Sequence, residues 1–189
     1  STHWFTMVGD AAYAYVYPRG NSTSVHIFKL ADGEEQADWQ PGIPSTGNNT
    51  ILGGPDGKIH VGACGYWDYG GYSTHAAQYV RLNPATGSKE TKDNVADSSN
   101  IAGQPCVISY AQGTPWLAYW TYEDGEQYQK LGADGEWSYQ GTLSTGQDYG
   151  MQFIVNEQAG VHLAYMNGNW SDADAVYKKL SGSPVTLCD

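Results

Sequence analysis

Four stretches of the sequence combine aromatic rings with carboxylate, amide or guanidinium groups, and each stretch separates two apolar, strand-like runs. A flat aromatic face accepts the apolar C–H side of a sugar ring, and fixed polar groups bind its hydroxyls. A carboxylate adds a strong acceptor for a pair of hydroxyl donors. The pattern predicts sugar-binding loops with thirteen candidate residues: Tyr17, Arg19, Tyr66, Trp67, Asp68, Tyr69, Trp120, Tyr122, Glu123, Asp124, Asn167, Trp170 and Asp172.

Rings within the apolar runs themselves have a structural interpretation, because Tyr and Trp fill the space between packed sheets. Tyr15, Trp116, Tyr119 and Tyr165 are therefore expected in the core. His60 and His162, together with the Lys or Arg of the repeated motif described next, are also expected to be structural.

A short motif occurs four times: an aromatic or β-branched residue, any residue, Lys or Arg, and then Leu. Its leucines are Leu30, Leu82, Leu131 and Leu180, which are 52, 49 and 49 residues apart. A turn rich in Gly, Asp, Asn or Ser follows each motif, and an apolar run precedes it. The pattern divides one domain, 1–189, into repeats of approximately 1–44, 45–97, 98–143 and 144–189.

The elements that position the loops are predicted to be strands. Glycines interrupt every candidate helix, and short apolar runs alternate with turns, which is typical of an all-β domain. A repeat of about 49 residues has the length of a propeller blade, roughly 40–50 residues. We therefore predict an all-β fold, a four-bladed β-propeller. The alternative is part of a larger ring that another chain completes.

The turn Ala133-Asp134-Gly135-Glu136-Trp137 keeps an Asp, a Gly and a Trp in compressed spacing, and Asp32-Gly33 repeats part of it. These turns resemble a degenerate Asp-box of sialidase-like and lectin-like propellers. The resemblance implies a propeller fold but no sialidase activity, because that enzyme class holds the substrate carboxylate with three arginines. This chain has only Arg19 and Arg81.

Composition excludes several functions. The 9 Lys and Arg against 20 Asp and Glu give a net charge of −11, which disfavours nucleic acid and anionic lipid as partners. No apolar run approaches the roughly 18 residues of a membrane span, so no membrane insertion is expected. Aromatic residues are 13% and charged residues 15% of the chain, which is typical of a folded domain and not of a disordered one.

Several features predict a secreted glycoprotein. The sequence starts at Ser1 without an initiator Met, and candidate N-glycosylation sites occur at Asn21, Asn48 and Asn169. Cys64 and Cys106 lie in strands of adjacent repeats and are the candidate disulfide. Cys188 is the alternative partner or a link between two chains.

The sequence favours a binding protein over an enzyme. It has no nucleophile elbow, phosphate loop or zinc-protease motif, and Asp172-x-Asp174 is too short for a calcium loop, so no metal or cofactor is expected. We therefore predict a lectin whose partners are glycans or glycoconjugates and which can form a homo-oligomer. One alternative is a glycan-active hydrolase or lyase with a single carboxylate-lined cleft. The other is a protein-interaction propeller.

Overall fold

A computed structural model describes residues 3–16, 25–32, 34–40, 50–69, 72–97, 101–144, 149–156, 160–169, 172–179 and 185–188, some of them by their backbone only. These residues form strands and turns and no helix, so none of them builds a helix that is long and apolar enough to span a membrane. The all-β prediction is confirmed.

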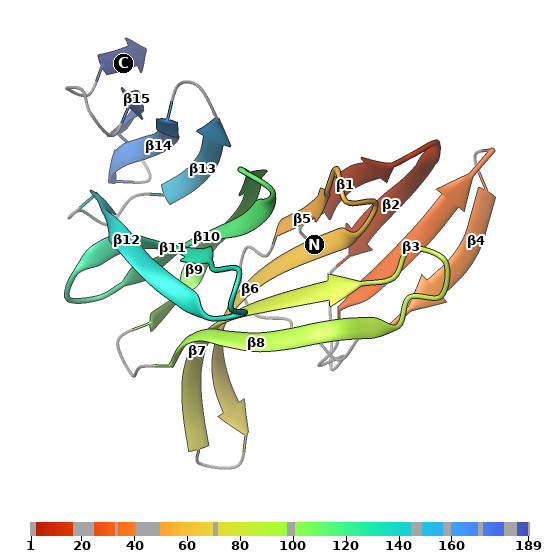
Figure 1. The fold of residues 1–189 in the computed structure, drawn as a ribbon. Coiled ribbons are helices and arrows are strands. Elements are labelled where there is room, and N and C mark those ends of the chain that lie inside the picture. Colours follow the sequence, from red (N-terminus) through yellow and green to blue (C-terminus); the bar gives the residue numbers. More distant parts are fainter. Residues whose placement is uncertain are drawn as a thin grey trace.

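The strands form four antiparallel sheets of four strands each, which we call blades 1 to 4 (Figure 1). Blade 1 contains β1 (His3–Val8), β2 (Ala11–Val16), β3 (His26–Ala31) and β4 (Glu34–Trp39). Blade 2 contains β5 (Thr50–Gly53), β6 (Ile59–Tyr69), β7 (Tyr72–Leu82) and β8 (Lys89–Asp97). Blade 3 contains β9 (Ile101–Ala111), β10 (Thr114–Thr121), β11 (Gly125–Leu131) and β12 (Trp137–Ser144). Blade 4 contains β13 (Tyr149–Asn156), β14 (Gly160–Asn169), β15 (Asp172–Lys179) and β16 (Val185–Cys188).

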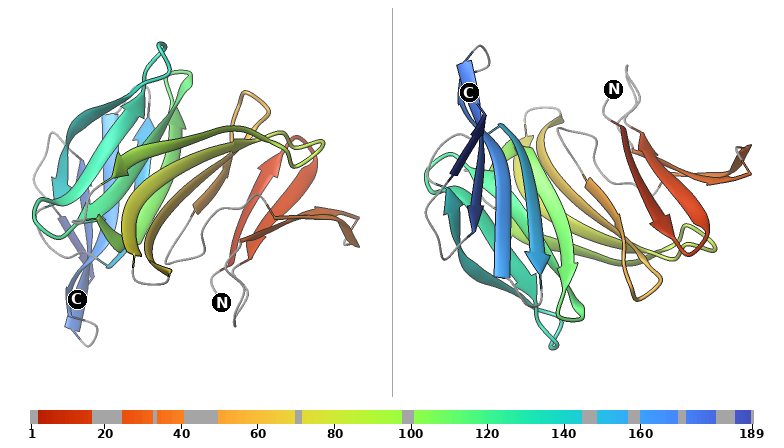
Figure 2. Two further views of the ribbon diagram at one scale, coloured as in Figure 1. Left: turned by 90° about the horizontal axis from the view of Figure 1, so that it is seen from below. Right: turned by 90° about the horizontal axis from the view of Figure 1, so that it is seen from above.

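The blades pack face to face, with the first strand of each one next to the first strand of its neighbour. This is the arrangement of a β-propeller, so the predicted fold class is confirmed. Figure 2 shows the blades following one another around an arc, with blade 1 at one end and blade 4 at the other.

The repeat seen in the sequence has one structural register. In every blade the Lys or Arg of the repeated motif lies directly opposite a ring-bearing residue of the second strand. The four pairs are Tyr13 with Lys29, His60 with Arg81, Trp116 with Lys130, and His162 with Lys179. Because side chains alternate between the two faces of a strand, an equal register places equivalent residues on the same face of each blade.

Apolar side chains on the facing sheets form the core. Tyr13, Tyr15 and Ile27 of blade 1 pack in one cluster with blade 2 residues such as Val61 and Val80, and all five are at most 2% exposed. Further clusters join blade 2 to blade 3 and blade 3 to blade 4. The core positions predicted for Tyr15, Trp116 and Tyr119 are buried, and Tyr165 is half-buried against the third cluster.

The outer face of blade 1 is open. Phe5 on β1 lies opposite Ala14, as Ile51 on β5 lies opposite Val61, so the two residues hold the same register position. Phe5 is 67% exposed whereas Ile51 is 6% exposed. Blade 1 covers Ile51, but no described blade covers Phe5, and this difference in packing explains the difference in exposure.

Cys64 on β6 and Cys106 on β9 are both buried, and neither of them is in a disulfide. The predicted disulfide between them is therefore not present in the structure. The two side chains are in contact, because the Cys64 thiol makes a hydrogen bond with the Cys106 side chain across the boundary between blades 2 and 3.

Candidate active site between blades 2 and 3

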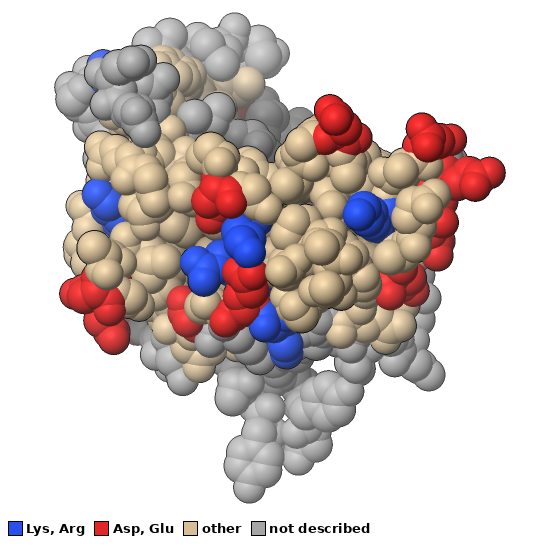
Figure 3. Space-filling view, turned by 45° about the vertical axis from the view of Figure 1, so that its right-hand side comes forward, with Lys and Arg blue, Asp and Glu red and all other residues tan. Residues whose placement is uncertain are grey.

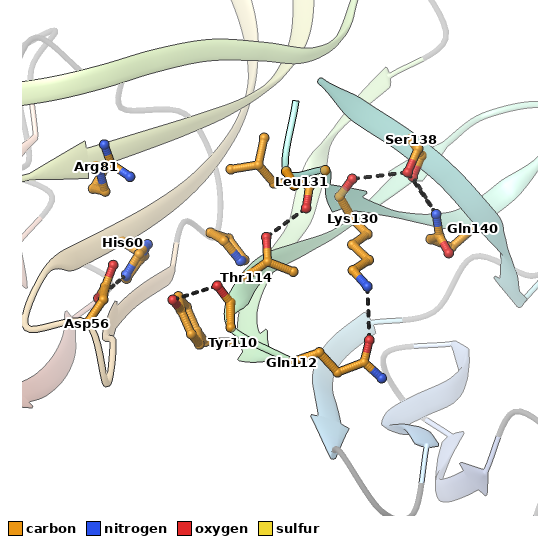
Figure 4. A pocket seen from close by; sticks show the side chains of 14 residues that line it. Asp56, His60, Arg81, Tyr110, Gln112, Thr114, Lys130, Leu131, Ser138 and Gln140 are labelled. Atoms are coloured by element: carbon orange, nitrogen blue, oxygen red, sulfur yellow. Dashed lines mark hydrogen bonds and ion pairs between the residues drawn. The ribbon is translucent and has the colours of Figure 1, made fainter. Parts of the chain in front are cut away.

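A basin of about 630 Å³ lies between blades 2 and 3, and we call it the seam basin. Figure 4 shows Asp56, His60 and Arg81 of blade 2 on one side and Lys130, Ser138 and Gln140 of blade 3 on the other, with Tyr110 and Thr114 between them. The basin therefore combines donors, acceptors and an aromatic ring from two blades.

The buried imidazole of His60 organises the blade 2 side of the basin. Its Nε2 lies 3.0 Å from Asp56 Oδ1, and its Nδ1 lies 2.8 Å from the Tyr79 hydroxyl. An ionised carboxylate only accepts hydrogen bonds, so Nε2–H donates to Asp56 and the Tyr79 hydroxyl donates to Nδ1. Burial lowers the pKa of His60, although the hydrogen bond to Asp56 opposes this shift. Burial also raises the pKa of Tyr79, which keeps its hydroxyl protonated.

The lowered pKa of His60 predicts a loss of stability in acid. The pKa of His60 is about 6.5 in the unfolded chain and lower in the folded chain. When the pH falls below about 6.5, His60 therefore becomes protonated in the unfolded chain while it is still neutral in the folded chain. Stability should fall with decreasing pH by up to about 1.4 kcal/mol per pH unit from this residue. The measurement is the urea midpoint of the wild type and of His60→Phe between about pH 7.5 and pH 5.5. Equal losses in both proteins would show that other groups cause the acid sensitivity.

Asp56 is placed by a turn with the sequence Gly54-Pro55-Asp56-Gly57, and Gly132-Ala133-Asp134-Gly135 makes the same turn in blade 3. The first Gly of each turn donates its N–H to the carbonyl four residues later, over 2.8 and 2.7 Å. Each aspartate accepts the backbone N–H two residues later at 3.1 Å. The last Gly of each turn has a positive φ, 72° and 86°, which other residues rarely adopt. The aspartate in the Asp-box-like segment thus shapes a turn.

Two basic residues of the repeated motif, Arg81 and Lys130, have partners within the fold. Arg81 Nε donates to Glu90 Oε2 over 3.1 Å, and Lys58 donates to the other oxygen of Glu90. Lys58, and to a smaller extent Arg81, lower the pKa of Glu90. Lys130 lies 5.0 Å from the centre of the Trp116 ring and donates to Gln112. Acidic and basic side chains accordingly lie next to each other at the centre of the face in Figure 3.

A second hollow of about 430 Å³ lies at the same boundary between blades 2 and 3, which we call the seam, and two carboxylates line it. We call it the seam hollow, and its lining residues are Asp93, Asn94, Val95, Gly135, Glu136 and Trp137. The Trp137 indole donates to Asp93 Oδ2 over 3.1 Å, and its ring meets the edge of the Tyr79 ring at 5.2 Å. Tyr79 therefore contacts His60 on one side and Trp137 on the other, and it connects the basin to the hollow.

A third hollow, also of about 430 Å³, lies along the first strands of blades 1 to 3 and extends to Val155 of blade 4. Its side chains include Trp4, Ile51 and Val107, with Thr6 and Ser109 as polar members. No carboxylate occurs among the described residues that line it, so this axial hollow offers hydroxyls and apolar contacts but no acid or base.

The predicted sugar-binding residues of blade 3 lie at the other end of β10 from the seam basin. Trp120 is only 9% exposed in β10, and it contacts the ring of Tyr122 at 4.9 Å. Tyr122, Glu123 and Asp124 are exposed in the turn that follows β10. The structure thus brings together the predicted residues of the third loop.

The other predicted residues are placed by backbone alone or lie outside the described residues. Tyr66, Trp67, Asp68 and Tyr69 end β6, in a hairpin with β7 that extends away from the other strands (Figure 1). Asn167 and the candidate glycosylation site Asn169 lie on β14, and Asp172 starts β15. Tyr17, Arg19, Trp170, Asn21 and Asn48 lie outside the described residues.

Three carboxylates of the seam, Asp56, Asp93 and Glu136, are absent from the predicted site residues. A signal for two of them was present in the sequence, because Gly-x-Asp-Gly occurs at 54–57 and at 132–135 and sets the turns that hold Asp56 and Glu136. Asp93 has no such signal. It reaches the hollow only because β8 of blade 2 packs beside the β11–β12 turn of blade 3.

Neither a protein-family model nor a curated protein sequence matches the chain. Solved structures do match its fold. A xylan beta-1,4-xylosidase of Bacillus halodurans C-125 superimposes on 97% of this chain with a TM-score of 0.63 and 14% identity, and the match covers 41% of that enzyme. The chain thus spans less than half of the xylosidase.

Two shorter enzymes match over more of their own length. An arabinanase of Bacillus subtilis has a TM-score of 0.54 at 11% identity, with coverage of 93% of this chain and 70% of that enzyme. An alpha-L-arabinofuranosidase of Clostridium thermocellum has a TM-score of 0.53 at 12% identity, with coverage of 99% and 72%. At these identities the likeness establishes the propeller fold alone.

These comparisons correct two interpretations of the sequence. The Asp-box resemblance pointed to the right fold, but the similar structures are glycoside hydrolases and not lectins or sialidases. The prediction of a lectin with repeated sugar sites is therefore wrong, and the alternative of a glycan-active hydrolase is better supported. The lectin prediction depended on the aromatic and polar composition of the loops, and neither loop composition nor fold by itself assigns a function.

Proposed function

We propose that the protein is a glycan-active hydrolase, which cleaves a glycosidic bond with water. The similar structures support the proposal, because a xylosidase, an arabinanase and an arabinofuranosidase all cleave glycans on this fold. Xylan and arabinan are accordingly the first substrates to test. Fold alone does not assign chemistry, so the proposal also needs a site that can supply an acid and a base.

The observation that carries the proposal is the pair of carboxylates in the seam hollow. Glycoside hydrolysis generally uses two carboxyl groups on either side of the scissile bond. Asp93 and Glu136 line one hollow from two different blades. The described lining of the seam basin contains one carboxylate, Asp56, and that of the axial hollow contains none.

The surroundings of the two carboxylates suggest different roles. The Trp137 indole holds Asp93 Oδ2 in place, so Asp93 is the oriented acceptor that removes a proton from water or attacks the sugar. Glu136 is exposed in the turn before β12 and, when protonated, gives its proton to the leaving oxygen. When Asp93 takes the proton of water, Asp93 ends protonated and Glu136 ends ionised, and exchange of one proton with solvent at each group restores the starting states. When Asp93 attacks the sugar instead, the ionised Glu136 takes a proton from the water that releases the sugar from Asp93.

Neighbouring polar groups can bind the substrate hydroxyls. Asn94 accepts a hydrogen bond from Gln78 at its Oδ1 over 2.9 Å, which leaves its amide N–H groups for a ligand. On the basin side, the amide of Gln140 and the hydroxyl of Tyr110 line the surface next to the cations. A glycan whose hydroxyls bind both at Asn94 and at Gln140 or Tyr110 would lie along the boundary between blades 2 and 3.

The experiment is an activity screen with the intact chain. The protein is incubated with xylan, arabinan and the aryl glycosides of xylose and arabinose, and new reducing ends or released aryl alcohol are measured. We expect turnover of at least one substrate, with a bell-shaped pH profile from the acid and the base. Binding of a glycan without turnover at any pH would overturn the proposal.

A further inference from the structure

We propose that Cys64 and Cys106 are a disulfide-forming pair that locks blade 2 to blade 3 beside the seam basin. The two thiols come from different blades, on β6 and β9, and their side chains make a hydrogen bond with each other. Cys64 is 1% exposed and Cys106 is fully buried. The inference is independent of the proposed hydrolase activity.

The surrounding contacts hold β5 and β6 of blade 2 against β9 of blade 3 at the level of the two cysteines. The Thr50 hydroxyl donates to the carbonyl of Cys106 over 3.1 Å and accepts the N–H of Ile108 over 2.8 Å, so β9 is held to β5 at the cysteine and two residues after it. Gly62, two residues before Cys64, has no side chain, and a Cβ at that position would come within 3.6 Å of Cys106 Sγ. The blades therefore approach closely at this level.

The same two strands carry the basin. His60 lies four residues before Cys64 on β6, and Tyr110 lies four residues after Cys106 on β9. The His60 and Tyr110 rings are 5.1 Å apart, so the strands remain side by side from the cysteine pair to the basin. A covalent bond at one end of this contact limits how far the blades can separate at the other end.

The reaction is a thiol–disulfide exchange with a small disulfide such as oxidised glutathione. One cysteine thiolate attacks a glutathione sulfur and releases one reduced glutathione, and the second thiolate attacks the mixed disulfide and releases another. Two protein S–H bonds are lost and one S–S bond forms, while the oxidant is reduced to two thiols. Burial raises the pKa of the Cys64 thiol, so we expect exchange while the blades are still assembling.

The three cysteines fall in three separate tryptic peptides, 59–81, 93–130 and 180–189, which makes the pairing directly measurable. The protein is refolded with reduced and oxidised glutathione, alkylated under denaturing conditions and digested without reduction. We expect peptides 59–81 and 93–130 as one linked species and a single alkylated cysteine, Cys188. Three alkylated cysteines, or a link that includes peptide 180–189, would overturn the proposal.

Thermal unfolding gives a second readout that does not depend on the digest. A disulfide of this kind typically raises the melting temperature of a domain of this size by about 5–15 °C. Reductant should lower the melting temperature of the wild type and of Cys188→Ala by this amount. Reductant should leave the melting temperature of the Cys64→Ala/Cys106→Ala double variant unchanged. An equal response of all three proteins would contradict the proposal even if the double variant folds less well.

Discussion

Replacing Asp93 by Asn, or Glu136 by Gln, should reduce glycan hydrolysis by about 10²–10⁴-fold, the range for loss of a positioned acid or base. Each substitution keeps the shape of the side chain and removes its ability to take or give a proton. In the Asp93→Asn variant the amide oxygen would still accept the Trp137 N–H, so the hollow should keep its geometry. The measurement is kcat on the best substrate of the screen. The pH profile of kcat is the second readout, because the bell-shaped profile of the wild type should lose one of its two limbs in each variant.

Two other carboxylates serve as matched controls for this experiment. Asp134 lies in the same turn as Glu136 and holds it through the backbone N–H of Glu136, a bond that an asparagine side chain can also accept. Asp134→Asn should therefore retain activity within a few-fold. Asp56→Asn tests the seam basin. If Asp56→Asn abolishes activity while Asp93→Asn and Glu136→Gln retain it, the chemistry takes place in the basin and not in the hollow.

The largest effect on stability is expected for Leu117→Ala. Leu117 is fully buried on β10, in the cluster that joins blade 2 to blade 3. Truncating a buried leucine typically costs about 2–5 kcal/mol, because apolar contacts are lost and a cavity remains. Urea unfolding should show this loss in the free energy of unfolding with an unchanged m-value. A loss below about 1 kcal/mol would indicate that blades 2 and 3 do not pack as described.

Gly62 provides a direct test of that packing. A Cβ at Gly62 would lie 2.6 Å from Leu117 Cδ1, closer than contact allows, so Gly62→Ala alone should cost about 1–3 kcal/mol. Leu117→Ala removes the obstructing atom. The double variant should therefore be more stable than the sum of the two single effects predicts, by at least about 1 kcal/mol. Additive effects would show that the two residues do not meet.

The regular part of the fold could be predicted because it depends on local pattern. The four motifs that end at Leu30, Leu82, Leu131 and Leu180 recur with nearly constant spacing, and such a repeat specifies one supersecondary unit several times. In the structure each Lys or Arg of the motif lies opposite a ring-bearing residue of the second strand. Strand identity, blade faces and buried rings follow from alternation along the chain, which the sequence displays directly.

The site could not be predicted because it depends on contacts between blades. Asp93 and Glu136 belong to different sheets and meet only where β8 packs beside the β11–β12 turn. The aromatic loops were predicted to bind sugars because of their composition, but in blade 3 the seam basin lies at the opposite end of the strands from the aromatic loop. Loop composition carries no information on which strand ends lie beside a hollow.

By itself, the sequence determined the all-β class, the repeat and the rings that fill the core, because these features require only side-chain alternation and turn chemistry between neighbouring residues. Tertiary structure alone decided that His60 donates to Asp56 and accepts from Tyr79, that two thiols share one seam, and that two distant carboxylates share one hollow. The physical reason is that packing of one sheet on another sets these distances, and the packing angle and offset of two sheets depend on all the side chains between them.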